Sequence, residues 1–141
     1  LQIYRSKLSG PLLDRIDIHV GMARLGKGEL LGAGDGESSA YVATRVAAAR
    51  AAQALRYHPA QLTNASAPKA QLEAGLELTS GARSGLGMAI DALALSGRGL
   101  DRVLRVARTI ADLDDRPQVA EDDVAEALSY RSDHSSLRSA P

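Results

Sequence analysis

Hydrophobic and polar positions separate most clearly along residues 95–113, LSGRGLDRVLRVARTIADL. At 100° per residue, apolar side chains recur here at i, i+3, i+4 and i+7 and form one stripe, with charged side chains on the opposite side. Ser96 is placed to cap the first turn, and Pro117 marks the exit because proline cannot continue a helix. The pattern predicts a long amphipathic helix whose apolar stripe is Leu100, Val103, Leu104, Ala107, Ile110 and Ala111.

A second long helix is predicted over residues 37–57. Acidic residues and serines stand at its start, where they suit the positive end of a helix. Its central block is almost all alanine, which permits close approach of another helix. The apolar side of this helix is expected to consist of Val42, Val46, Ala49 and Leu55.

Three further helices follow from the same spacing. Residues 71–78 predict a short helix, after a loop over residues 58–69 that contains two prolines. Thr79 or Ser80 can cap the next one. The last helix spans residues 121–131 and begins with three acidic residues. In the helix that follows Thr79 and Ser80, the inward positions are Ala82, Leu86, Ala89, Ile90 and Leu93. In the helix over residues 121–131 they are Val124, Ala127 and Leu128.

The N-terminal part of the chain has a different pattern. Residues 16–20 alternate apolar and polar, which is typical of a half-buried strand, and Pro11 opens a short helical turn before it. A single short strand needs partners, so we expect the chain to be a piece of a longer protein. Residues 26–36 hold five of the 13 glycines and predict a hinge. They lack the G-x-x-x-x-G-K-[ST] pattern of a phosphate-binding loop, and residues 132–141 are expected to be disordered.

The amino-acid composition excludes several classes of function for this chain. The 141 residues contain 17 basic and 17 acidic side chains, so no overall charge attracts nucleic acid or an anionic membrane. There is no cysteine, which excludes disulfides and thiolate zinc sites and favours a cytoplasmic location. No apolar run approaches the roughly 20 residues of a membrane span. The three histidines have no companions at metal-ligand spacing, so no metal site is predicted.

Three arginines, Arg98, Arg102 and Arg105, share one face of the helix over residues 95–113. A solvated face with ion pairs such as Asp101 with Arg105 explains this pattern without any function. Contact with an anionic ligand is the alternative. The spacing alone favours the solvated face.

Two segments together carry a family resemblance. YRSKLSGPLLDRIDIHV at residues 4–20, and LALSGRGLDRVLRVARTIADL with VAEDDVAEALSYR within residues 93–131, resemble the magnesium-chelatase-like AAA+ ATPases, in particular their bacterial competence-protein group of the ComM and YifB type. The resemblance implies a mainly α fold: a small helical bundle, the AAA+ lid domain, preceded by a short helix and strand left over from the α/β ATPase core. The implied division is core remnant (1–25), glycine-rich hinge (26–36), helical lid (37–131) and tail (132–141).

Site residues are implied by the same resemblance. Arg15 matches the arginine finger that such proteins present to the nucleotide of a neighbouring subunit, where a guanidinium stabilises charge on the transferring phosphoryl group. Arg98 matches the sensor-2 arginine, which contacts the nucleotide of its own subunit, and Arg102 is a further candidate. The adjacent Gly97 and Gly99 depart from the family pattern and predict a late start of this helix.

The resemblance further implies ATP and Mg²⁺ as cofactors of the full-length protein, identical subunits in a hexameric ring as partners, and DNA as the substrate in recombination and natural transformation. This chain contains no Walker A, Walker B or sensor-1 segment, so by itself we expect it to be inactive and to bind no cofactor. The alternative function is a helical module without enzymatic activity. Such a module would contact nucleic acid or a protein through the face that carries Arg98, Arg102 and Arg105.

Overall fold

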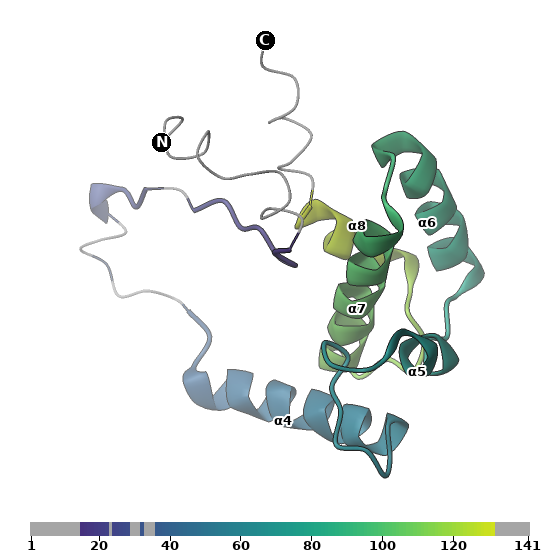
Figure 1. Ribbon diagram of the computed structural model, residues 1–141. Coiled ribbons are helices and arrows are strands. Elements are labelled where there is room, and N and C mark those ends of the chain that lie inside the picture. The colour runs from purple at the N-terminus through teal and green to yellow at the C-terminus, as the bar shows by residue number, and fades with distance from the viewer. Residues whose placement is uncertain (1–14, 23, 29–31, 33–35, 132–141) are drawn as a thin grey trace.

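A computed structural model describes residues 15–22, 24–28, 32 and 36–131. Five helices span the last of these ranges, and no sheet occurs within the described residues. They are α4 (Ser39–Arg56), α5 (Lys69–Ala74), α6 (Ser80–Leu93), α7 (Gly97–Leu113) and α8 (Glu121–Ser129). Figure 1 shows α7 between α4, α6 and α8, with α5 near the turn that follows α4. The prediction of a mainly α fold is confirmed.

The helix starts follow from their capping residues. Ser38, Thr79 and Ser96 each accept a hydrogen bond from the backbone N–H three residues later, at 3.2, 3.2 and 3.0 Å. Because Ser96 caps its first turn, α7 begins at Gly97, and the predicted late start was wrong. Asp123 Oδ2 accepts from the N–H of Ala120 at 2.7 Å and fastens the start of α8.

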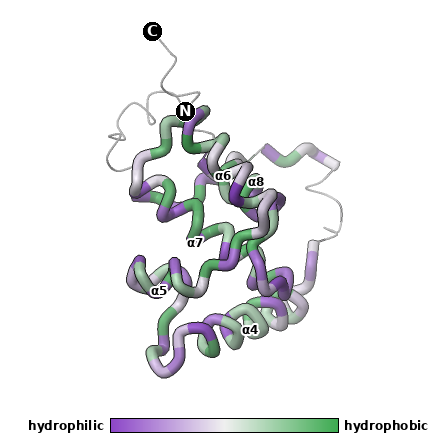
Figure 2. Tube along the Cα trace, turned by 90° about the vertical axis from the view of Figure 1, so that its right-hand side faces the viewer, coloured by the Kyte–Doolittle hydropathy of each residue, from purple (hydrophilic) through white to green (hydrophobic). Residues whose placement is uncertain are grey.

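Helix α7 packs on its apolar stripe as predicted. Val103, Ala107 and Ala111 are fully buried, and the remaining three stripe residues pack against the same cluster. Alanines allow α8 to approach both α7 and α6 closely, and Figure 2 shows hydrophobic residues along α7. A parallel β-bridge between Leu78 and Val119 ties the segments that lead into α6 and α8. The other members of this core are Ala82, Leu86, Val119, Val124 and Ala127.

The opposite side of α7 is also covered, because α4 packs against it. Arg108 and Asp112 lie on the charged side of this helix and are therefore buried. A second small cluster of Tyr57, Ala67 and Leu72 lies at this end of the bundle, and Leu104 contacts both clusters. The stripe on α7 thus predicts one buried face correctly but misses the second.

Predictions for α4 fit less well. The helix exists over nearly the expected range, but Val42, Val46 and Leu55 are 40, 42 and 82% exposed. Its buried residues are Ala49 and Gln53. The short side chain of Ala49 allows the close approach to α7, while the larger apolar groups point away from this contact.

The predicted strand over residues 16–20 was wrong. No strand is formed in this described segment, and Ile16, Ile18 and Val20 are 40, 49 and 62% exposed. An alternating pattern makes a strand only beside a partner strand, and the described residues offer none. The segment instead meets a helix end, where the N–H of His19 donates to the carbonyl oxygen of Tyr130 at 3.0 Å. Of the predicted helical turn at residues 11–15, only Arg15 is described, and most of the hinge and the tail over residues 132–141 lie outside the described residues.

Candidate functional site

The arginines of α7 have very different surroundings. Arg98 lies in the first turn of the helix and is exposed. It has no hydrogen bond or ion pair with any residue that the structure describes. Room exists beside it, since a side chain at Gly97 would meet nothing within 4 Å. Within the described residues, the guanidinium of Arg98 is therefore unpaired.

Arg102, one turn further along, contacts the N-terminal segment. Its Nη1 lies 2.7 Å from Asp17 Oδ1, and its side chain is only 18% exposed. Together with the hydrogen bond from His19 to Tyr130, this ion pair holds residues 17–19 against α7 and the end of α8 (Figure 1). Arg102 is thus a candidate ligand whose guanidinium already has an acidic partner.

Arg105 is occupied by the chain itself. Its Nε donates to Asp101 Oδ2 at 2.8 Å, and its Nη1 donates to the carbonyl oxygens of Asn64, Ala65 and Ala67 at 2.7, 3.2 and 2.9 Å. These bonds fasten the loop between α4 and α5 to α7. Arg105 therefore supports the bundle, and the three-arginine stripe is not a continuous binding face.

Arg108 and Asp112 form a buried ion pair with side chains only 1% exposed. Arg108 Nη2 lies 2.9 Å from Asp112 Oδ1, and the guanidinium also donates to the carbonyl oxygens of Arg116 and Pro117. Desolvation by burial lowers the pKa of Arg108, and the charge of Asp112 opposes this shift. The pair therefore connects α7 to the turn that leads into α8.

Asp112 also accepts hydrogen bonds from α4 and from the loop that follows it. Arg56 donates to its two oxygens at 2.9 and 2.5 Å, and the amide of Asn64 donates at 2.8 Å. Burial by itself would raise the pKa of Asp112, but hydrogen bonds from Arg56 and Asn64 and the charge of Arg108 hold it below the ordinary value. The carboxylate of Asp112 therefore connects α7 to α4 and to the loop between α4 and α5.

Asn64 completes this network. Its Oδ1 accepts from the hydroxyl of Tyr57 at 2.8 Å and from Arg56 at 3.2 Å, and its N–H donates to Gln53 Oε1 at 3.2 Å. Burial raises the pKa of Tyr57, so its hydroxyl keeps the proton that it donates. Every polar atom of the buried Asn64 side chain is paired, which indicates a structural role.

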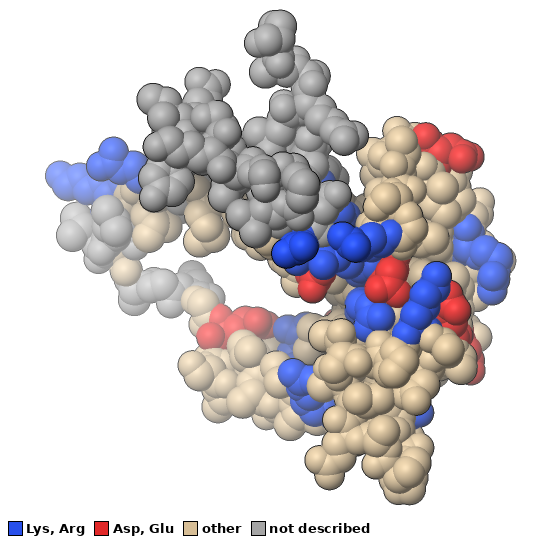
Figure 3. Space-filling view, viewed as in Figure 1, with Lys and Arg blue, Asp and Glu red and all other residues tan. Residues whose placement is uncertain are grey.

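Arg15 lies in an exposed turn, two residues before Asp17. It forms no hydrogen bond or ion pair with the described part of the chain. Figure 3 shows blue basic side chains gathered over the part of α7 near the end of α8, with acidic side chains among them. Of the three arginines named for nucleotide contact, Arg15 and Arg98 are exposed and unpaired within the described ranges, whereas Arg102 pairs with Asp17.

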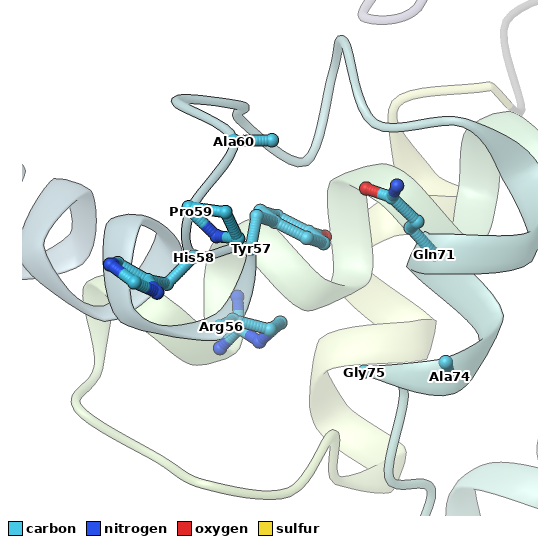
Figure 4. A pocket seen from close by; sticks show the side chains of 8 residues that line it. All are labelled: Arg56, Tyr57, His58, Pro59, Ala60, Gln71, Ala74 and Gly75. Atoms are coloured by element: carbon cyan, nitrogen blue, oxygen red, sulfur yellow. The ribbon is translucent and has the colours of Figure 1, made fainter.

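One hollow on the bundle, about 290 Å³, lies between the end of α4 and α5 (Figure 4). Arg56 and Tyr57 line one side of it and Gln71 and Gly75 the other, but the charge of Arg56 is satisfied by Asp112. Within the described ranges, no three His, Asp or Glu side chains meet in a way that could hold a metal ion, and no helix combines the length and apolarity needed to cross a bilayer.

Sequence reasoning missed the acidic partners. Asp17 was seen only as a polar position of a strand, although it is two residues from Arg15. The spacing of Arg108 and Asp112, four residues apart on a helix, is a signal for an ion pair, but it does not indicate burial. Asn64 gave no signal from spacing, because its partners lie on α4 and α7.

Comparisons with known proteins agree with this architecture. The family model described as magnesium chelatase, subunit ChlI C-terminal, matches residues 36–131, and the model of magnesium chelatase, subunit ChlI, matches residues 1–30. Over 129 residues, the chain is 47% identical to the uncharacterized protein Rv2897c of Mycobacterium tuberculosis. It is 39% identical to the competence protein ComM of Haemophilus influenzae and 37% identical to the uncharacterized protein YifB of Escherichia coli.

Each of these alignments covers 91% of the chain and 25% of the relative, so the chain spans about a quarter of the length of its curated relatives. The C-terminal family model covers the whole helical bundle, from before α4 to the end of α8. This match and the relatives agree with the segments at residues 4–20 and 93–131 that carry the family resemblance. The chain belongs to the magnesium chelatase ChlI family and is related to the ComM and YifB proteins.

Proposed function

We propose that this chain is the lid-bearing part of an AAA+ ATPase, and that Arg98 contacts the nucleotide bound by its own subunit. The observation that carries the proposal is the contrast along α7. Arg105 and Arg108 are engaged by the chain's own carbonyl and carboxylate oxygens, whereas Arg98 is exposed and unpaired among the described residues. Its position in the first turn adds the positive potential of a helix N-terminus, which favours an anion such as a phosphate group.

Arg15 is proposed as the arginine finger that reaches the nucleotide of the neighbouring subunit. A guanidinium is suited to this role because it stays charged and forms two parallel hydrogen bonds to phosphoryl oxygens. Its exposure in a turn leaves it accessible to a second subunit. ATP and Mg²⁺ would be held by parts of the protein that this chain does not contain, since it has no Walker A or Walker B sequence.

The larger assembly follows from the family. We propose a ring of identical subunits, a hexamer, because a finger acting in trans requires repeated head-to-tail interfaces. The competence protein ComM among the relatives supports DNA as the substrate of this motor, in recombination or branch migration during natural transformation. Residues 1–25 would belong to the ATPase core, residues 26–36 to a hinge and residues 37–131 to the lid, with a tail over residues 132–141.

ATP hydrolysis by the full-length protein tests the two arginines. Arg98→Ala should lower kcat/KM about 10- to 100-fold, the value of a hydrogen bond to a charged group. Arg15→Ala should lower kcat about 1,000-fold or more, as for other arginine fingers. Arg83→Ala, at an exposed site on α6, is the control and should behave as the unaltered protein. Unchanged turnover of either test variant would remove that residue from the site.

Mixed rings test which subunit each arginine serves. A subunit with Arg15→Ala still has Arg98, and a subunit with Arg98→Ala still has Arg15. In an equal mixture, about a quarter of the interfaces would combine both intact arginines and regain activity, if Arg15 acts in trans. Mixtures as inactive as the separate variants would contradict this arrangement.

A nucleic-acid-binding module without enzymatic activity remains the second candidate. Arg102 and Arg105 have partners within the chain, which leaves Arg98 as the arginine of the proposed face without a partner among the described residues. Binding of DNA by this chain at two salt concentrations separates the candidates, because phosphate contacts weaken steeply with salt. Salt-sensitive binding that is lost in Arg98→Ala would favour the module.

A further inference from the structure

The ion pair between Asp17 and Arg102 joins two segments that lie far apart in the sequence. Asp17 Oδ1 is 2.7 Å from Arg102 Nη1, and the neighbouring hydrogen bond from His19 to Tyr130 measures 3.0 Å. These contacts fasten the segment that follows Arg15 to α7 and to the end of α8. Figure 1 shows this purple segment close to the C-terminal end of α8.

The position of this pair relates the two unpaired arginines. Arg15 precedes Asp17 by two residues, and Arg98 precedes Arg102 by four residues, or about one helical turn. The Asp17–Arg102 ion pair therefore links the start of α7 to the Arg15 segment, beside the hydrogen bond from His19 to Tyr130. The connection is short, and it lies outside the apolar core of the bundle.

The pair joins a largely buried guanidinium to a half-exposed carboxylate. The side chain of Arg102 is 18% exposed and that of Asp17 is 55% exposed. The Nη1 atom of Arg102 is buried and has no hydrogen bond among the described residues, so its contact with Asp17 is a charge interaction. Asp101, the adjacent acidic residue on α7, is engaged by Arg105. Among the described residues, Asp17 is the ion-pair partner of Arg102, so loss of the pair leaves a largely buried guanidinium without a counter-charge.

We propose that Asp17 is a positioning residue, which couples the Arg15 segment to α7 through Arg102. The inference rests on the proposed function, in which Arg98 contacts the subunit's own nucleotide and Arg15 the neighbour's. Nucleotide contact at Arg98 then sets the orientation of α7, and the Asp17–Arg102 pair sets the position of Arg15 at the adjacent interface. Arg102 acts in this scheme by holding Asp17 rather than by binding phosphate.

Steady-state ATPase kinetics of the full-length protein test the coupling. Asp17→Asn and Arg102→Gln should each lower kcat about two- to fivefold, the range expected for an ion pair of this exposure. KM for ATP should stay within about twofold, because the subunit's own nucleotide contact at Arg98 is intact. The exchanged pair, Asp17→Arg with Arg102→Asp, should restore kcat to within about twofold of the unaltered protein.

Glu73→Gln is the matched control, since it removes the exposed Lys69–Glu73 ion pair far from these contacts and should leave kcat unchanged. Unchanged kcat in Asp17→Asn, or an exchanged pair no better than the product of its single variants, overturns the inference. A rise in KM of Arg102→Gln with unchanged kcat also overturns it and makes Arg102 a nucleotide ligand. If Arg15→Ala and Arg98→Ala retain activity, the proposed function itself fails, which is a separate outcome.

A structural readout covers variants that fold poorly. The N–H of His19 donates to the carbonyl oxygen of Tyr130 at 3.0 Å, so amide hydrogen exchange at His19 reports this contact. In the full-length protein, Asp17→Asn should speed exchange at His19 relative to the unaltered protein, measured by mass spectrometry of the peptide that contains it. An unchanged exchange rate contradicts the docked segment.

Discussion

Replacing Asp112 by alanine should cost more stability than any exposed charge in the bundle. This carboxylate accepts hydrogen bonds from Arg56, Arg108 and Asn64, and its side chain is 1% exposed. Loss of the carboxylate leaves the guanidinium of Arg108, which is equally buried, without a counter-charge. Removal of one partner from a buried ion pair costs about 3–5 kcal/mol of unfolding free energy. For a domain of this size, that lowers Tm by more than about 10 °C.

Urea unfolding followed by far-UV circular dichroism measures this loss, since the chain has no tryptophan to report by fluorescence. Asp114→Ala is the control, because Asp114 pairs with Arg45 and Arg116 but is 43% exposed, and its loss should cost less than about 1 kcal/mol. A loss for Asp112→Ala no larger than this control refutes the reasoning.

A double variant identifies the cause of the loss. If the stranded charge is responsible, adding Arg108→Met to Asp112→Ala should recover about half of the lost free energy or more, because an apolar pair replaces an orphaned guanidinium. The carbonyl oxygens of Arg116 and Pro117 lose their donor in this variant, which limits the recovery. No recovery would show that the hydrogen bonds from Arg56 and Asn64 account for the stability instead.

Three further predictions concern the same network. Burial raises the pKa of Asp112, but hydrogen bonds from Arg56 hold it below the ordinary 3.8, so the unfolded chain binds more protons there. The free energy of unfolding should therefore fall as the pH drops below about 4, and urea midpoints should show a weaker fall in Asp112→Asn. Gly75→Ala would place a Cβ 2.6 Å from Arg56 Cδ and should cost about 1–3 kcal/mol, whereas Gly87→Ala in α6 meets nothing within 4 Å and should stabilise by about 0.5–1 kcal/mol. A change of Tm in the same direction for Gly75→Ala and Gly87→Ala would contradict this account. Arg105→Ala should cost about 1–3 kcal/mol and speed amide exchange in the loop between α4 and α5, and protection equal to that of the unaltered chain would contradict its role.

The local pattern of apolar and polar residues was sufficient to predict most helices of this protein. The apolar stripe of α7 and the caps at Thr79 and Ser96 depend on residues three and four apart, and the structure has each of them in place. Such features need only the geometry of a single helix, so the sequence predicts them. The family was also evident from short stretches of sequence, because motifs are local.

Burial on the second side of α7 was decided by the tertiary structure. Arg108 and Asp112 have the spacing of a solvated ion pair, and only the packing of α4 makes them the buried junction of the bundle. The same spacing groups Arg98, Arg102 and Arg105 together, yet their partners come from residue 17, from the loop after α4, or from no described residue.

The periodicity of a sequence predicts which neighbours a side chain has on its own helix, but not which other segments pack against it. The sequence alone therefore determined where α4, α6, α7 and α8 form and which face of α7 is apolar, whereas the short helix expected over residues 71–78 is observed at Lys69–Ala74. Tertiary structure decided which arginine has no partner among the described residues, because that depends on contacts between segments far apart in the sequence, such as Asp17 and Arg102, which are 85 residues apart.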